Sequence, residues 1–261
     1  MTTAAEFLGA QLGEDGSGTF ELGEHMHGAF GGVFGGAVAA ASILAARPAA
    51  PGRRPFSLHT TFVRGLSTPT CTSTVEVVAA GRTVSTVSIE LHDEAGKLAA
   101  RSTATFAEPA ALSAQDADGR VTPPGDQAYD DGAVLQFPGP RVPPIVELMA
   151  PRLVGDVVGG FAHAVKLPWD ADPATAAEAT CMAADFCVGV PVTTALTEFV
   201  PMPNPDITLR FLGDESADVL VAVGRLARIN RGVAGTEVEV WTPDGAMLGI
   251  GLSSTVLLGG A

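Results

Sequence analysis

The stretch VFGGAVAAASILAA, residues 33–46, decides the fold of this chain. It contains no charged residue, and its large side chains include Val33, Val38, Ile43 and Leu44. A helix that is apolar on every side must be buried on every side. At 1.5 Å per residue the stretch spans about 21 Å, which is too short to cross a bilayer. We therefore predict a core helix surrounded by strands, although an ordinary core helix need have no role in chemistry.

The sequence after this helix predicts four antiparallel strands. The first begins near Phe56, and glycine-containing turns separate the later ones. Val87, Ile89 and Leu91 alternate with polar residues, and this period of two is typical of a strand with one buried face. One helix followed by four strands indicates a sheet that curls around its helix.

The second half of the chain repeats this pattern. One constant shift, without a gap, aligns Phe62 with Phe211 and the turn glycine Gly96 with Gly245. The second copy therefore predicts another core helix, within TAAEATCMAADFCVGV at residues 175–190. Two copies of one unit normally pack through a pseudo-twofold axis.

Proline and aspartate-rich turns set residues 109–150 apart from the two repeats. We interpret this stretch as a linker. It divides the chain into an N-terminal unit, residues 1–108, and a C-terminal unit, residues 151–261.

The composition narrows the class of protein. With 46% apolar and 17% charged residues the chain is globular, and a net charge of −14 argues against nucleic acid or an anionic membrane as partner. Three cysteines give no disulfide framework, and no histidine spacing near them suits zinc, so we expect no metal. The N-terminus lacks the basic start and apolar run of a signal peptide, which favours the cytoplasm. Exposed sheet edges often pair, so we expect a homo-oligomer.

Sequence motifs for other chemistries are missing as well. The chain has no G-x-S-x-G elbow, no Walker loop and no G-x-G-x-x-G after a strand. We therefore expect no cofactor.

Three motifs in the first half resemble the acyl-CoA thioesterase II family. VFGGAVAAA at residues 33–41 is similar to the family's VFGG-x-V helix start, and FSLHTTFVR at residues 56–64 to its SLH-x-x-F-x-R strand. GRTVSTVSIELHDEAGKL at residues 81–98 resembles the hairpin that follows, and AADF at residues 183–186 matches the second half more weakly. The resemblance implies an α+β double hotdog, two antiparallel sheets each wrapped around a central helix. It also implies hydrolysis of acyl-CoA thioesters by a water held among Asp, Thr and Gln side chains.

Asp185 is the strongest candidate for a catalytic residue. It is the only charge between Ala179 and Leu196, and its helical neighbours are small or apolar. Burial of such a carboxylate is costly and raises its pKa, and a carboxylate in a half-dry cleft suits the deprotonation of water. A buried, hydrogen-bonded structural aspartate is the alternative. The repeat carries the first helix onto residues 182–195 and matches Asp185 with Gly36, so one half alone would hold the carboxylate.

The other family positions are altered in this chain. The resemblance places the family's Thr on Asn204 and its Gln on Ser253. Either side chain can hold a water, and the alignment is loose enough that Thr208 or Ser254 are alternatives.

Four further residues are candidates for substrate binding. Gly35 and Gly36 offer backbone N–H groups at a helix N-terminus, where they can polarise a thioester carbonyl, or they merely permit tight packing. His59 and Arg64 lie in the strand motif that matches the family. Arg64 is also a cation available for phosphates on an acidic protein.

The sequence thus predicts an acyl-CoA thioesterase with altered active-site residues. Two alternatives stay open. One is a non-catalytic protein that binds acyl-CoA or a small apolar ligand, and the other is a thioesterase for another acyl carrier.

Overall fold

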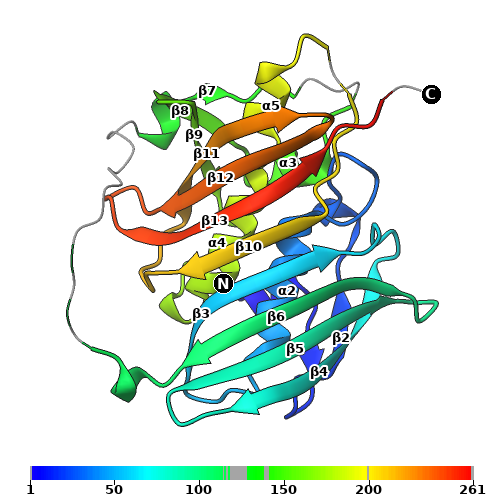
Figure 1. Ribbon diagram of the computed structural model, residues 1–261, viewed down its shortest axis with the longest axis vertical. Helices are drawn as coiled ribbons and strands as arrows, with labels where there is room; N and C mark the ends of the chain where they lie inside the picture. The colour runs from blue at the N-terminus through cyan, green and yellow to red at the C-terminus, as the bar shows by residue number, and fades with distance from the viewer. Residues whose placement is uncertain are drawn as a thin grey trace.

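The computed structural model describes residues 2–113, 115, 117, 128–137, 141–198 and 200–259. Its strands form one 13-stranded sheet of antiparallel neighbours, in the order β1-β2-β4-β5-β6-β3-β10-β13-β12-β11-β9-β8-β7 (Figure 1). The first half contributes β1 (Gln11–Leu12), β2 (Gly18–Glu21), β3 (Arg54–Phe62), β4 (Thr70–Ala80), β5 (Val84–Asp93) and β6 (Leu98–Ala107). The second half contributes β7 (Ala133–Val134), β8 (Arg152–Val157), β9 (Gly160–Lys166), β10 (Asp206–Phe211), β11 (Val219–Asn230), β12 (Val233–Trp241) and β13 (Met247–Val256).

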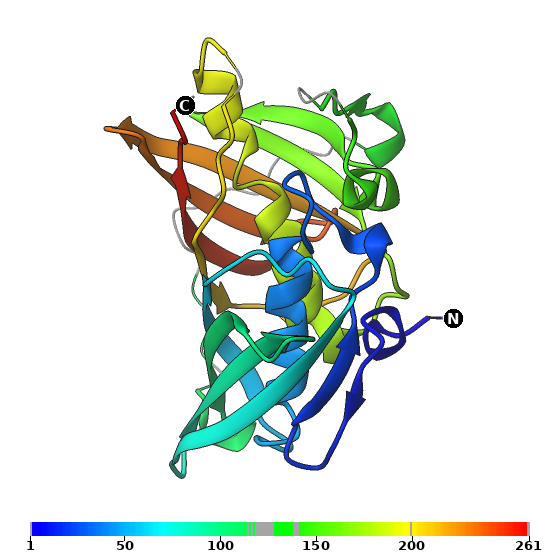
Figure 2. The same cartoon turned by 90° about the vertical axis from the view of Figure 1, so that its right-hand side faces the viewer.

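Two central helices, α2 (Gly35–Ala46) and α4 (Ala176–Phe186), lie inside the curve of this sheet and pack against each other (Figure 2). The shorter helices are α1 (Ala4–Phe7), α3 (Pro144–Met149) and α5 (Val190–Ala195). Single 3-10 turns are η1 (Glu24–Met26), η2 (Pro109–Ala111), η3 (Tyr129–Asp131) and η4 (Pro173–Thr175). Each half therefore has the predicted form, a sheet wrapped around its own helix. The two half-sheets are continuous, because β3 pairs with β10.

The central helices pack antiparallel and very closely. A side chain at Gly36, near the start of α2, would lie 2.9 Å from the carbonyl oxygen of Cys181 and 3.0 Å from the Cα of Met182, so the helix contact requires a glycine there. At the opposite end of the pair, Arg47 Nη2 donates a hydrogen bond of 2.7 Å to Glu178 Oε2. The predicted core helix is confirmed, and its Ala-rich sequence is what allows the second helix to approach it.

The repeat predicted from the sequence holds strand by strand. The shift of 149 residues that separates His59 from Thr208 maps the end of β3 onto the end of β10, and maps β6 onto β13 residue for residue. His59 and Thr208 also lie directly opposite each other where β3 meets β10, with 2.8 Å between Nδ1 and Oγ1. Equivalent residues face each other only on a twofold axis, so the pseudo-twofold passes through this pair.

The helices do not follow the same shift, which corrects one prediction. A shift of 149 would place the second helix at residues 182–195, whereas α4 spans Ala176–Phe186 and α5 is a separate helix. The cause is the connection to the next strand, which is residues 47–53 in the first half but residues 187–205, including α5, in the second. Gly36 and Asp185 are therefore not equivalent positions. Gly36 lies in the first turn of α2, and Asp185 lies in the last turn of α4.

Part of the predicted linker, residues 109–150, lies outside the described residues. Its described part forms η2, η3, β7 and α3 and contacts both halves. Ala133 of β7 pairs with Leu153 of β8, while the Ile145 N–H donates to the His27 carbonyl at 3.2 Å. In the described part of the chain, no helix has the length and apolar character needed to span a membrane.

Candidate active site

A cavity of about 820 Å³ opens where α2 begins and α4 ends. Its wall comes from the loop before α2, the end of β3, the described part of the predicted linker, the end of α4, α5, the segment before β10 and the end of β13. Most of the side chains in this wall are apolar, and they include Phe30, Val33, Phe34, Val38, Phe62, Leu66, Leu135, Phe137, Ile145, Val146, Phe186, Val188 and Met202. Such a wall suits an apolar ligand that meets a few polar groups.

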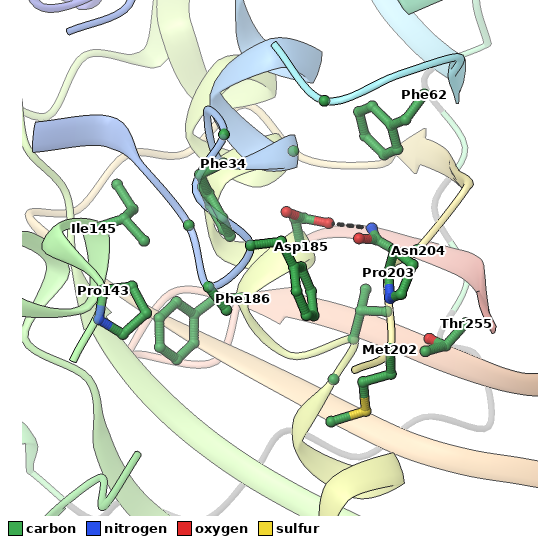
Figure 3. Close-up of a pocket in the computed structure, with 18 of the residues that line it drawn as sticks. Phe34, Phe62, Pro143, Ile145, Asp185, Phe186, Met202, Pro203, Asn204 and Thr255 are labelled. Carbon is green, nitrogen blue, oxygen red and sulfur yellow. Dashed lines mark hydrogen bonds between the residues drawn. The ribbon is translucent and has the colours of Figure 1, made fainter. Parts of the chain in front are cut away.

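Asp185 lies in this wall and is held by two hydrogen bonds, of which Figure 3 draws the one from Asn204. Its Oδ2 accepts from the Gly36 N–H at 2.8 Å, and its Oδ1 accepts from Asn204 Nδ2 at 2.7 Å. The side chain is fixed in position, because one donor belongs to a helix backbone and the other to the segment before β10. Each carboxylate oxygen keeps a second lone pair, so Asp185 can still accept a hydrogen bond from water.

Burial controls the charge of Asp185. The residue is 8% exposed, and desolvation raises its pKa from 3.8 to about 6, while the hydrogen bonds from Asn204 and Gly36 pull the pKa downward. The carboxylate is therefore mostly ionised near pH 7. Its pKa is also close to this pH, so it can both accept and release a proton. This is the condition for an efficient general base.

The start of α2 supplies a second polar element beside the carboxylate. A Cβ at Gly35 would lie 2.9 Å from Asp185 Oδ2, so the backbone at this glycine directly adjoins the carboxylate. The Gly36 N–H is occupied by Asp185, whereas the Gly35 N–H has no hydrogen-bond partner among the described residues. An unpaired N–H at a helix N-terminus can stabilise a negatively charged oxygen.

The structure brings several of the predicted residues together. Asp185, Asn204, Gly35 and Arg64 all line the cavity. Gly36 does not line the cavity, but its N–H donates to Asp185, which does. Arg64 is exposed at the rim, where its Nε donates to the Leu98 carbonyl at 2.8 Å.

Ser253 and His59 do not reach the cavity wall. The Ser253 hydroxyl donates to the Asp206 carbonyl at 2.6 Å, so the position of the family's Gln is turned toward the backbone of β10. His59 is exposed and bonded to Thr208 on the pseudo-twofold axis, and it does not line the cavity although Phe62, where β3 ends, does. Ser254, an alternative to Ser253, is likewise bonded to Asp206.

Two parts of the cavity wall were not predicted from the sequence. One is Thr255, two residues beyond Ser253 on β13, which the period of two puts on the same face of the strand. The other is the linker, which contributes Leu135, Gln136, Phe137, Pro143, Ile145 and Val146. The apolar pair Ile145 and Val146 after Pro144 predicts a helix turn but gives no sign of what that turn covers.

A buried cysteine and histidine lie together outside the cavity wall. Cys187 Sγ is 3.8 Å from His163 Nδ1 and donates to the Ala222 carbonyl at 3.1 Å. Burial raises the pKa of Cys187 and lowers the pKa of His163 to about 4. Both groups are therefore neutral near pH 7, and the pair lacks the thiolate that a nucleophile requires. In the part of the chain that is described, no three His, Cys, Asp or Glu side chains cluster as a metal site would require.

Comparison with protein families supports the resemblance in the first half. Residues 24–107 match the model of the acyl-CoA thioesterase N-terminal domain, a span that begins before the loop of the cavity and ends with β6. A search of curated proteins found no match.

Solved structures match the chain over its whole length. A conserved protein of unknown function with a hot dog fold from Alicyclobacillus acidocaldarius is 20% identical, with a TM-score of 0.77 and 100% of both chains covered. An acyl-CoA thioesterase II from Mycobacterium marinum is 17% identical, with a TM-score of 0.77 and 99% of both chains covered. A tesB protein from Mycobacterium avium subs paratuberculosis is 16% identical, with a TM-score of 0.74 and 98% of both chains covered. These likenesses confirm the predicted hotdog fold.

Proposed function

We propose that this protein is an acyl-CoA thioesterase in which Asp185 orients and deprotonates the attacking water. The observation that carries the proposal is a single buried carboxylate, aimed into a largely apolar cavity and held by two donors. The match of residues 24–107 to an acyl-CoA thioesterase domain supports the same reaction. A place in the wall of an apolar cavity, together with a pKa raised to about 6 by burial, is what a catalytic carboxylate requires.

The geometry supports a direct attack by water. Asp185 accepts a proton from the water as the water oxygen bonds to the thioester carbon. The carbonyl oxygen becomes negatively charged and is stabilised by the Gly35 N–H at the start of α2. The carbon–sulfur bond then breaks, and the protonated Asp185 returns its proton to the leaving thiolate. The products are a carboxylic acid and a free thiol, with no covalent intermediate.

Asn204 acts as a positioning residue in this scheme. Its Nδ2 donates to Asp185, and this bond favours the ionised form of the carboxylate. Its carbonyl oxygen remains able to accept a hydrogen bond from the same water. Asn204 thereby takes the place that the family gives to Thr. Ser253, at the position of the family's Gln, does not line the cavity, and the glutamine that does is Gln136, before α3.

The two ends of the substrate differ in polarity, and the inner wall and the rim of the cavity differ in the same way. The apolar wall suits the acyl chain, with Phe34 and Phe186 as its aromatic pair, their ring centroids 6.4 Å apart. Arg64 is tethered through Nε at the exposed rim, which leaves the outer guanidinium nitrogens for the phosphates of the carrier.

A panel of acyl-CoA esters tests the proposal. The purified chain should release free CoA, and Asp185→Asn should reduce kcat by about 10²–10⁴-fold while ligand binding persists. Turnover that is unchanged in this variant would place the chemistry elsewhere.

The alternatives predict other results. Tight binding of acyl-CoA without release of CoA would instead identify a binding protein. This alternative stays open because Asn204 and Ser253 differ from the Thr and Gln of the family. Carrier-protein esters that are hydrolysed far faster than CoA esters would identify a different carrier.

A further inference from the structure

Two polar side chains in the cavity wall are buried, and only one of them has partners. Asp185 accepts two hydrogen bonds, as described above. Thr255 is 0% exposed, and its hydroxyl has no hydrogen-bond partner among the described residues. A buried hydroxyl without a partner destabilises the folded protein, so its presence in a ligand cavity needs an explanation.

The position of Thr255 separates it from the reacting centre. It lies beside Met202 and Pro203, on the far side of these residues from Asp185 (Figure 3). The Val256 N–H donates to the Pro203 carbonyl at 3.0 Å, which fixes the end of β13 against the segment that carries Asn204. Thr255 is therefore held in place but is not positioned to bind the attacking water.

Exposure indicates which part of a substrate Thr255 would meet. The exposed residues of the cavity wall, such as Phe30 and Val63, are 55% and 47% exposed, and with Arg64 they mark an opening to solvent. The thiol carrier of a thioester is large and must extend through such an opening. A fully buried residue beside Met202, which is 9% exposed, therefore faces the acyl part.

We propose that the Thr255 hydroxyl binds an oxygen atom on the acyl chain, so that the site selects hydroxyacyl or oxoacyl thioesters over unsubstituted ones. This inference rests on the proposed thioesterase function. A hydroxyl both donates and accepts, and hence it pairs with either kind of oxygen. A plain alkyl chain leaves the hydroxyl unpaired, and sites built to bind a substrate oxygen reject analogues that lack it.

The test compares matched substrates and isosteric variants. Decanoyl-CoA is compared with hydroxydecanoyl-CoA and oxodecanoyl-CoA esters whose oxygen stands at successive carbons. In the wild-type protein, kcat/KM for the best oxygenated ester should exceed that for decanoyl-CoA by about tenfold or more. Thr255→Val should bring this ratio close to one, and Thr255→Ser, which keeps the hydroxyl, should retain it. The inference is overturned if the wild type shows no preference or if Thr255→Val keeps it.

Thermal stability provides an independent control. Thr236 on β12 is also 0% exposed, but its hydroxyl donates to the Val188 carbonyl at 3.2 Å. Thr236→Val should lower Tm because it leaves that carbonyl unpaired, whereas Thr255→Val should leave Tm unchanged or raise it. An equal loss of Tm in both variants would show that the Thr255 hydroxyl has a hydrogen-bond partner within the protein, and would overturn the inference.

Direct binding separates this inference from the proposed function. Calorimetric titration with hydroxydecanoic and decanoic acids measures selection without turnover. Tighter binding of the hydroxy acid that depends on the Thr255 hydroxyl supports the inference even if no ester is hydrolysed. Hydrolysis of esters without any such difference in binding or kcat/KM leaves the thioesterase proposal standing and refutes the role of Thr255.

Discussion

Replacement of Asp185 by Asn should stabilise the protein at neutral pH while it abolishes most turnover. The carboxylate is 8% exposed and its pKa is raised from 3.8 to about 6 by burial. The folded protein therefore binds this proton more tightly than the unfolded chain does. The stability that the proton provides is fully present below about pH 4 and is lost as pH rises through 6.

The magnitude follows from the shift in pKa. A shift of about two units corresponds to roughly 3 kcal/mol at pH 7, and the free energy of unfolding changes by about 1.4 kcal/mol per pH unit within the window. Asn cannot ionise, so the variant is free of this penalty. It keeps both hydrogen bonds if its oxygen accepts from the Gly36 N–H and the amide of Asn204 rotates to accept from its Nδ2.

Urea unfolding of the two proteins between about pH 4 and pH 7 measures this difference. The gain in stability of Asp185→Asn should be near zero at the acidic end and grow to at most about 3 kcal/mol at pH 7. The matched control is Asp206→Asn on β10, whose carboxylate accepts from the Ser254 N–H at 2.8 Å but does not line the cavity. This control should lose stability and keep turnover. A difference for Asp185→Asn that does not vary with pH would refute a desolvated carboxylate at this site.

Three further predictions concern the neighbours of Asp185 and the helix pair. The kcat/KM of the wild type should rise with pH through an apparent pKa of about 6. Asn204→Ala should move this midpoint to higher pH, because the variant loses a hydrogen bond that favours the ionised form of Asp185. Both effects are measured in pH–rate profiles. Arg64→Ala should raise KM for acyl-CoA with little change in kcat, and the effect should shrink at high salt, whereas a matching fall in kcat would contradict a role at the carrier end. Arg47→Leu should destabilise the protein by about 3–5 kcal/mol in urea unfolding, because the carboxylate of Glu178, which is 0% exposed, would be left as an unpaired buried charge. Adding Glu178→Gln to this variant should recover part of the lost stability.

The sheet was predictable from the sequence because its signal is local and repeated. Alternation at Val87, Ile89 and Leu91 identifies a strand with one buried face, and all three side chains are buried. The same alternation recurs after the shift of 149 that separates His59 from Thr208, so the two halves confirm each other. The first helix was equally predictable, because a helix without charged residues has no polar face and must be buried on all sides.

The composition of the cavity wall was less predictable because it depends on contacts between distant segments. Ile145 and Val146 form an unremarkable helix turn in sequence, yet the turn covers the cavity because its backbone is bound to His27. The family motif pointed to Ser253, but a serine is too short to act as the family's Gln and instead bonds to the backbone of Asp206. On the same face of β13, Thr255 contributes to the wall, and nothing in its local sequence distinguishes it from other strand residues.

The pairing of Asp185 with Gly36 explains why only one of the two repeats carries a candidate site. The sheets fix one register between the halves, but the longer connection through α5 frees α4 from it and brings its last turn to the first turn of α2. Asp185 thereby meets the N-terminus of the opposite helix, where a backbone N–H holds it and the helix dipole favours its charge. The last turn of α2, SILAA at residues 42–46, offers no acid to the start of α4. The pseudo-twofold that builds the scaffold is thus broken at the two helix ends, and the carboxylate lies at the end where a cavity opens beside it.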